Sequence, residues 1–85
     1  MTPIESIFEI RASLLDMLPY LNSESAWVAG RARGKYEQLV DRFFREHGRL
    51  VKPEQRSECL HDYDYFLKLM ESTEESYYSD YECSP

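Results

Sequence analysis

The sequence contains few residues that break helices or cross-link chains. Its 85 residues include only three glycines, four prolines and two cysteines. An all-β domain needs many glycine- and proline-rich turns, so this scarcity argues against β-structure and favours helices. The spacing of Cys59 and Cys83 matches no zinc motif. We expect two free thiols in a reducing compartment, with a disulfide as the alternative.

Long apolar runs and targeting segments are also lacking. No stretch approaches the roughly 20 apolar residues that span a bilayer. The opening MTPIESIFEI already carries acidic side chains and lacks the basic start of a secretory signal. We therefore expect a cytoplasmic protein that makes no membrane contact.

Motifs for catalysis and cofactors are absent as well. No glycine-rich loop of the phosphate-binding type occurs, and the chain has two histidines. The one cluster with potential chemistry is CLHDYDYF, residues 59–66, which contains His61, Asp62 and Asp64. Helical metal sites usually take pairs of ligands from more than one helix, whereas here Asp62 lies about 100° from His61 on one side and Asp64 about 60° on the other. We expect no enzyme activity, no metal site and no cofactor.

The chain does contain the apolar content of a folded domain. Hydrophobic residues make up 42% of it and aromatic residues 14%, with a net charge of −6. Such a composition is not that of a disordered chain. A domain of this size hides only about 60% of its surface on folding, so a partner or a second copy would add stability.

Helical spacing occurs in three segments, about 3–18, 24–47 and 53–71. Thr2 can cap the first helix and Glu5 completes a capping box, whereas Pro19 should end or kink it. Gly48 after His47 suggests a left-handed cap on the second helix. The predicted fold is all-α, a small three-helix bundle or a helical hairpin plus a third helix, in a single domain of residues 1–71. The apolar stripes are formed by Ile4, Ile7, Phe8, Leu14, Leu15 and Leu18, by Ala29, Ala32, Tyr36, Leu39, Val40 and Phe43, and by Cys59, Leu60, Tyr63, Phe66, Leu67 and Met70.

Residues 72–85 form an acidic segment rich in tyrosine and serine, without any aliphatic side chain. Ser72 and Glu75 can form another capping box. The segment is predicted to be a tail, which is either a short terminal helix or disordered.

The stretch AWVAGRARGKY, residues 26–36, places two glycines inside the second predicted helix. Each interior glycine costs roughly 1 kcal/mol relative to alanine. Ala26, Gly30 and Gly34 share one side, which would permit close approach of a neighbour. The alternative is that the helix begins only near Gly34, with residues 26–33 as a looser segment.

The same region is basic within an acidic protein. Residues 25–53 contain seven basic and three acidic side chains. A basic stripe beside a tryptophan can bind phosphates and stack on a base, although a solvated helix face is the simpler interpretation. The candidate nucleic-acid-binding residues are Trp27, Arg31, Lys35, Arg42 and Arg45.

Three further arginines, Arg11, Arg33 and Arg56, lie on or beside the apolar stripes. A buried guanidinium is costly unless it is paired. One interpretation is that these side chains extend their charged ends to solvent or form a pair within the chain, with Asp16, Asp64 or Glu71. The other is that these faces meet a partner or a second copy.

Residues 54–85 are strongly acidic, with nine acidic and two basic side chains. On one continuous third helix, Tyr65 and Leu69 fall on the side away from the apolar stripe and are expected to be exposed among carboxylates. Tyrosine is a good interface anchor, and carboxylates around it steer toward a basic partner. A solvated acidic face is the alternative. The predicted partner-binding residues are Glu58, Asp62, Tyr65, Leu69, Tyr77, Tyr78, Asp80, Tyr81 and Glu82.

Small size, acidity, helicity and the lack of catalytic motifs together suggest a binding protein. In size and charge this profile is similar to that of many phage-encoded antagonists of host machinery, including anti-CRISPR proteins. The similarity does not extend to any sequence motif. The leading hypothesis is a non-catalytic protein-binding module, a small acidic inhibitor that blocks a partner protein with a basic surface. Its sharpest version is a DNA mimic acting on a nucleic-acid-handling machine. The alternatives are a nucleic-acid-binding module that uses the basic stripe, and a structural homo-oligomer such as a homodimer.

Overall fold

The computed structural model of the protein describes residues 2–82, and side chains as far as residue 79. Within this part the chain forms four α-helices and no strand. The all-α prediction is confirmed, but there is one helix more than predicted. The helices are α1 (Pro3–Leu21), α2 (Ala26–His47), α3 (Gln55–His61) and α4 (Tyr63–Glu82).

The first two helices begin with side-chain caps. The Thr2 hydroxyl oxygen accepts the backbone N–H of Glu5 at 3.1 Å, and Ser25 caps α2 by accepting from Val28 at 3.4 Å. Pro19 does not end α1, which continues to Leu21. The missing proline N–H affects only the last turn, where its loss costs one hydrogen bond.

The predicted third helix is in fact two helices separated at Asp62. This residue is extended, with φ −149° and ψ 107°. Its carboxylate accepts the backbone N–H groups of Asp64 at 3.0 Å and Tyr65 at 3.4 Å, so Asp62 both ends α3 and caps α4. Helix α4 then runs past Ser72 without a break. Residues 72–82 are therefore helical, which is one of the two predicted forms, but they continue α4 instead of forming a separate short helix.

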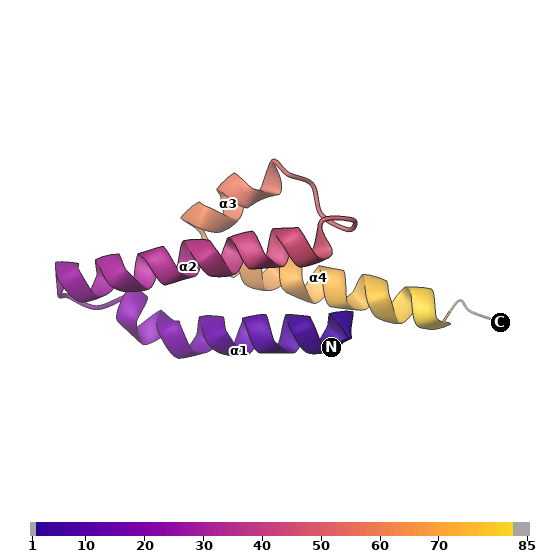
Figure 1. The fold of residues 1–85 in the computed structure, drawn as a ribbon, viewed down its shortest axis with the longest axis horizontal. Helices are drawn as coiled ribbons and strands as arrows, with labels where there is room; N and C mark the ends of the chain where they lie inside the picture. Colours follow the sequence, from indigo (N-terminus) through magenta and orange to yellow (C-terminus); the bar gives the residue numbers. More distant parts are fainter. Residues whose placement is uncertain (1, 83–85) are drawn as a thin grey trace.

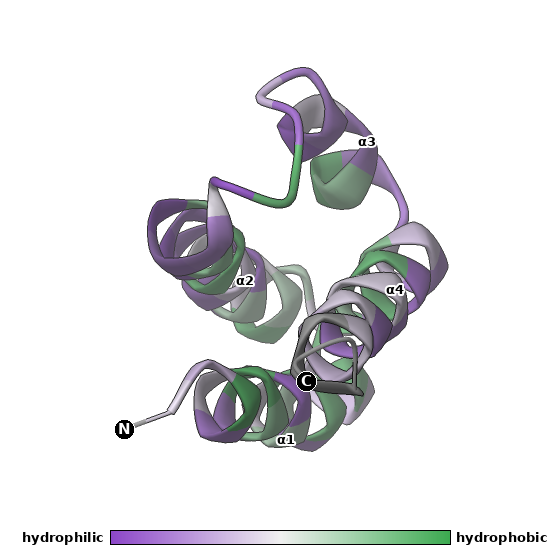
Figure 2. Cartoon of the chain, turned by 90° about the vertical axis from the view of Figure 1, so that its right-hand side faces the viewer, coloured by the Kyte–Doolittle hydropathy of each residue, from purple (hydrophilic) through white to green (hydrophobic). Residues whose placement is uncertain are grey.

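Helices α1 and α2 form an antiparallel pair, α4 packs against both of them, and α3 lies on the outer side of α2 (Figure 1). Figure 2 shows the apolar faces of these helices turned toward one another. The ring of Phe66 meets Tyr36 and Phe43 edge-on, with centroids 5.8 and 5.3 Å apart. The buried core consists of Ile7, Ile10, Leu14, Tyr36, Leu39, Val40, Phe43, Val51, Cys59, Phe66 and Met70.

Two residues of the predicted apolar stripes are exposed, and two residues of the predicted tail are buried or partly buried. Phe8 and Leu15 belong to the predicted stripe of α1 but are about half exposed. Thr73, by contrast, is buried and its hydroxyl donates to the Leu69 carbonyl at 2.8 Å. Tyr77 also packs against the core. The first half of the predicted tail is thus part of the folded body.

The glycines do not act as predicted. Gly48 has φ −61° and is not a left-handed cap. A Cβ there would lie 2.8 Å from the Phe44 carbonyl oxygen, so glycine is needed for a close approach. Helix α2 begins at Ala26, which excludes the looser segment, and a Cβ on Gly30 or Gly34 would meet no atom within 4 Å. No described neighbour uses the close approach that these glycines permit.

Candidate functional site

The three arginines on the apolar stripes are paired within the chain, with partners other than those predicted. Arg11 contacts the Glu74 carboxylate at 3.3 Å, which joins α1 to α4. Arg33 donates to the Leu60 carbonyl, and Arg56 pairs with Asp41 at 2.6 Å. None of them needs a second copy of the chain to satisfy its charge.

The basic stripe of α2 is divided between two environments, and the first is an ion-pair junction with α1. Arg42 contacts Glu9 and Glu46, each at 2.8 Å. The hydrogen bonds to these carboxylates raise the pKa of Arg42. Two hydrogen bonds lower the pKa of Glu46, and the bond from the Ser6 hydroxyl has a larger effect than the bond from Arg42. Arg42 therefore ties α1 to α2, while Arg45 stays exposed.

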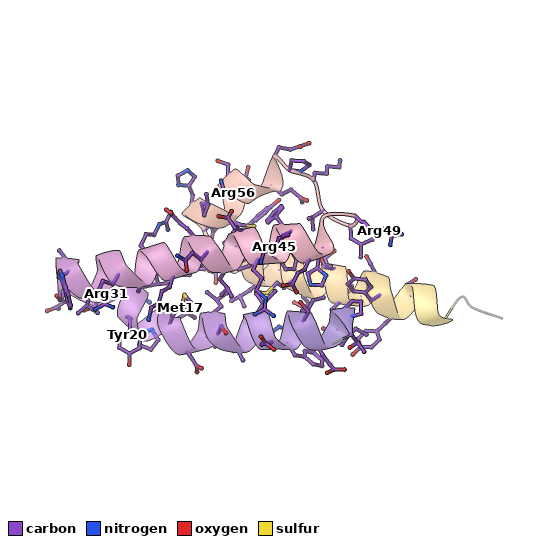
Figure 3. The ribbon with its side chains drawn as sticks, viewed as in Figure 1. Met17, Tyr20, Arg31, Arg45, Arg49 and Arg56 are labelled. Atoms are coloured by element: carbon purple, nitrogen blue, oxygen red, sulfur yellow. The ribbon has the colours of Figure 1, made fainter. Side chains whose placement is uncertain are left out.

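The second environment is a groove of about 550 Å³ between the end of α1 and the beginning of α2. Trp27 stands on its rim with 70% of its surface exposed, and Tyr20 on the α1 side is 59% exposed. The Arg31 guanidinium lies 5.1 Å from the centroid of the Trp27 ring. Figure 3 shows Met17, Tyr20 and Arg31 together at this end of the molecule. The groove is lined by Ser13, Asp16, Met17, Tyr20, Trp27, Val28, Arg31, Ala32 and Lys35.

Sequence reasoning identified one wall of this groove and missed the other. Trp27, Arg31 and Lys35 were expected on a common face of the second helix, and they all line the groove. The α1 wall was missed because Pro19 was expected to end or kink the helix before Tyr20. The spacing of Met17 and Tyr20, three residues apart, would have placed them on one side of a longer helix.

The predicted acidic contact surface is not arranged as expected. Tyr65 and Leu69 are half-buried against the core, and the Tyr65 hydroxyl accepts a hydrogen bond from Gln55 at 3.1 Å. The prediction assumed one continuous helix, whereas the break at Asp62 lets α3 fold back against α4 and cover part of this side. Tyr77 is also partly buried, with its hydroxyl 2.7 Å from the Nδ1 atom of His47.

Helix α4 exposes a different set of side chains. Asp64, Glu71, Glu75 and Tyr78 are exposed at spacings that place them on one side of the helix, and we call this set the α4 stripe. Lys68 is exposed within the same stripe. The exposed Glu58 lies on α3, while the Asp62 carboxylate serves as the cap of α4. The side chains of Asp80, Tyr81 and Glu82 lie outside the described part.

Ion pairs engage more of the acidic groups on α1 and α2 than of those on α3 and α4. Among residues with described side chains, the ion pairs engage Glu9, Glu37, Asp41 and Glu46 of α1 and α2. Of the described carboxylates on α3 and α4, Glu74 alone is paired. The acidic charge of the α4 stripe is therefore not neutralised by ion pairs within the described chain.

In the cluster at residues 59–66, Cys59 is buried in the core and the Asp62 carboxylate caps α4. Burial, followed by the nearby Glu58, raises the pKa of the Cys59 thiol to about 12, so this thiol stays protonated at neutral pH. Cys83 lies outside the described residues. Nowhere in residues 2–82 do three His, Cys, Asp or Glu side chains gather in a way that could hold a metal ion.

None of the helices described here is both long enough and apolar enough to cross a bilayer. No family model, no curated protein and no solved structure matches this chain.

Proposed function

We propose that the protein is a non-catalytic binding module that attaches to another protein through the α4 stripe and blocks a basic surface on it. The supporting observation is the uneven ion pairing. Four of the six carboxylates on α1 and α2 are engaged by arginines, whereas Asp64, Glu71 and Glu75 face solvent without an ion pair to any described residue. A protein that needed these acids only for folding would gain by pairing them.

The stripe has the physical properties of a contact surface. Its carboxylates raise the rate of encounter with a positively charged partner, because complementary fields steer association. Tyr78 is 45% exposed beside them and can bury a large ring at a low cost in side-chain entropy. Charge would provide steering and orientation, and the tyrosine would provide buried area.

The sharpest form of the proposal is mimicry of a nucleic acid. Carboxylates spaced along a rigid helix would occupy the positions that phosphates take in a basic groove. The partner would then be a nucleic-acid-handling protein, and the module would act as a phage-type antagonist such as an anti-CRISPR protein. Size, charge and the exposed acidic helix support this form.

The test is affinity capture from nuclease-treated lysate of the native source, using the full-length chain. The variant Glu71→Lys/Glu75→Lys reverses the stripe, while Glu24→Lys/Glu54→Lys makes the same change in net charge at two exposed positions elsewhere. Truncation at Met70 is unsuitable because it removes Thr73 and Tyr77, which pack in the fold.

We expect one protein to be captured by the wild type and by the control variant, and to be lost with the reversed stripe. The lost partner should carry a basic surface, and its capture should weaken as salt is raised. Undiminished capture by the reversed stripe would contradict the proposal.

A further inference from the structure

The groove and the α4 stripe lie on different sides of the molecule. Residues of α1 and α2 alone line the groove. Helix α4 lies alongside this helix pair (Figure 2), and its stripe is exposed to solvent. The groove is at the end of the molecule where α1 joins α2, and the last turns of α4 project from the opposite end (Figure 1). The longest dimension is 53 Å, so a chain cannot place its own α4 end in its own groove.

We propose that this groove binds the α4 stripe of a second copy of the chain. The inference goes beyond the proposed function, because it concerns a second surface and needs no other protein. The charges, the helical spacing and the aromatic rim of the groove all favour this one occupant.

The charges match in sign and in spacing. Arg31 and Lys35 on the α2 wall are four residues apart, as are Glu71 and Glu75 on the stripe. Four residues on a helix correspond to about 6 Å, so two antiparallel helices can place Glu75 opposite Arg31 and Glu71 opposite Lys35. Each pair would bring together charges that have no ion-pair partner among the described residues of one copy.

The same alignment accounts for the aromatic rim. Trp27 and Lys35 are separated by about 12 Å along α2, and Tyr78 and Glu71 by about 10 Å along α4. Tyr78 would therefore meet Trp27 at the mouth of the groove. The pairing would cover an indole that is 70% exposed in one copy.

The opposite wall distinguishes this occupant from a nucleic acid. Asp16 lines the groove on α1, where its carboxylate would repel a phosphate backbone. Lys68 lies within the α4 stripe and would give that carboxylate a partner. The aromatic and basic side chains alone would suit a single strand, but the acidic wall and the net charge of −6 favour the stripe.

An interface between two different patches cannot close on itself in a simple dimer. Each bound copy offers a new groove and a new stripe, so association is head-to-tail and open-ended. The wild-type protein should form dimers and larger species as its concentration rises, and high salt should reverse this association.

Complementary variants test the geometry directly. Arg31→Glu/Lys35→Glu disables the groove and leaves the stripe intact, whereas Glu71→Lys/Glu75→Lys does the reverse. All four side chains are exposed, and an unchanged helical circular dichroism spectrum checks that each variant is folded. The control is Arg45→Glu/Arg49→Glu, at two exposed arginines that Figure 3 shows away from the groove.

The expected result is measured by sedimentation velocity and Trp27 fluorescence. Either groove or stripe variant alone should lose at least about tenfold in self-association, because like charges then face each other. A mixture of the two should regain association, including species larger than a dimer, because the unchanged groove meets the unchanged stripe and the two reversed surfaces also carry opposite charges. Trp27 emission should then shift to shorter wavelength. The control should associate like the wild type.

Three outcomes would overturn the inference. The first is a wild type that stays monomeric up to about 1 mM in low salt. The second is association that the groove variant leaves unchanged, or a mixture that forms no dimer. The third is a monomer whose groove binds single-stranded nucleic acid and loses it on Arg31→Glu/Lys35→Glu. Since none of these measurements includes a second kind of protein, each outcome leaves the proposed function standing.

Discussion

The two halves of α2 are built for different purposes. From Tyr36 to His47 the helix buries side chains on nearly every turn, and four of these are fully enclosed or almost so. From Ala26 to Lys35 only Ala32 is buried, Trp27 is largely exposed and two glycines face open space. The packed half meets α1, α3 and α4, while the open half forms one wall of the groove.

The contrast arises from what α1 offers at each end, because the basic residues of α2 are similar along its length. Beside the packed half, α1 presents Glu9 and Ser6, which hold Arg42 directly and through Glu46. Beside the open half, it presents Met17 and Tyr20, which leave Arg31 stacked on an indole. One arginine therefore contributes to folding, and the other is available for recognition.

The largest expected effect is the difference in lost stability between alanine substitutions in the two halves of α2. Phe43 is fully buried, and replacing it with alanine should lower the free energy of unfolding by about 3–5 kcal/mol. That is most of what a domain of this size has. Trp27→Ala should change it by less than about 0.5 kcal/mol, because an exposed side chain loses few contacts. Urea unfolding followed by circular dichroism measures both.

A similar loss from Trp27→Ala would show that the open half also supports the fold, and the comparison would fail. Trp27→Phe is the matched control, since it keeps an aromatic ring on the rim of the groove.

The sequence predicted where helices form more reliably than how they are phased. The caps at Thr2 and the apolar periodicity are local signals, and both are found in the structure. The break at Asp62 is not visible in hydrophobic spacing, because the stripe from Cys59 to Met70 fits one helix. The break lets α3 fold back against α4, so Tyr65 lies beside Gln55 of α3 and is partly covered, whereas Phe66 and Met70 are in the core as predicted. Only the Asp-x-Asp pattern of CLHDYDYF carried a hint of a side-chain cap.

The groove was half predictable for a related reason. Its α2 wall lies on one helix and follows from helical spacing. Its α1 wall depends on how two helices pair, which is a property of tertiary packing. The burial of Thr73 and Tyr77 was missed because neither is aliphatic, although each satisfies its hydroxyl with a hydrogen bond to a folded neighbour.

A smaller effect of opposite sign is expected from the glycines of the open half. Gly30→Ala and Gly34→Ala should each raise the free energy of unfolding by about 0.5–1 kcal/mol, because alanine restricts the unfolded chain and the added methyl meets nothing. Gly48→Ala, at the end of the packed half, should lower it, since its Cβ would lie 2.8 Å from a carbonyl oxygen. Thermal unfolding of the three variants gives the order, and a destabilising Gly30→Ala would mean that the open face has an unseen contact.

The smallest expected effect is a dependence of stability on pH that arises in the packed half of α2. His47 is buried between the Ser6 hydroxyl and the Tyr77 hydroxyl, and burial lowers its pKa from 6.5 despite the nearby carboxylate of Glu46. Below about pH 6.5 the unfolded chain therefore binds a proton that the folded chain does not. Stability is fully present above that pH and declines as the pH falls, until the lowered pKa is reached.

Chemical unfolding between about pH 5 and 7.5 measures this dependence above the range in which Glu46 titrates, because the pKa of that carboxyl is lowered from 4.5. His47→Gln should be less stable near neutral pH and should lose the decline across this interval. His61→Gln changes an exposed histidine and should keep the wild-type decline. If the free energy of unfolding changes equally with pH in the wild type and in His47→Gln, another group causes the decline and the prediction for the packed half is wrong.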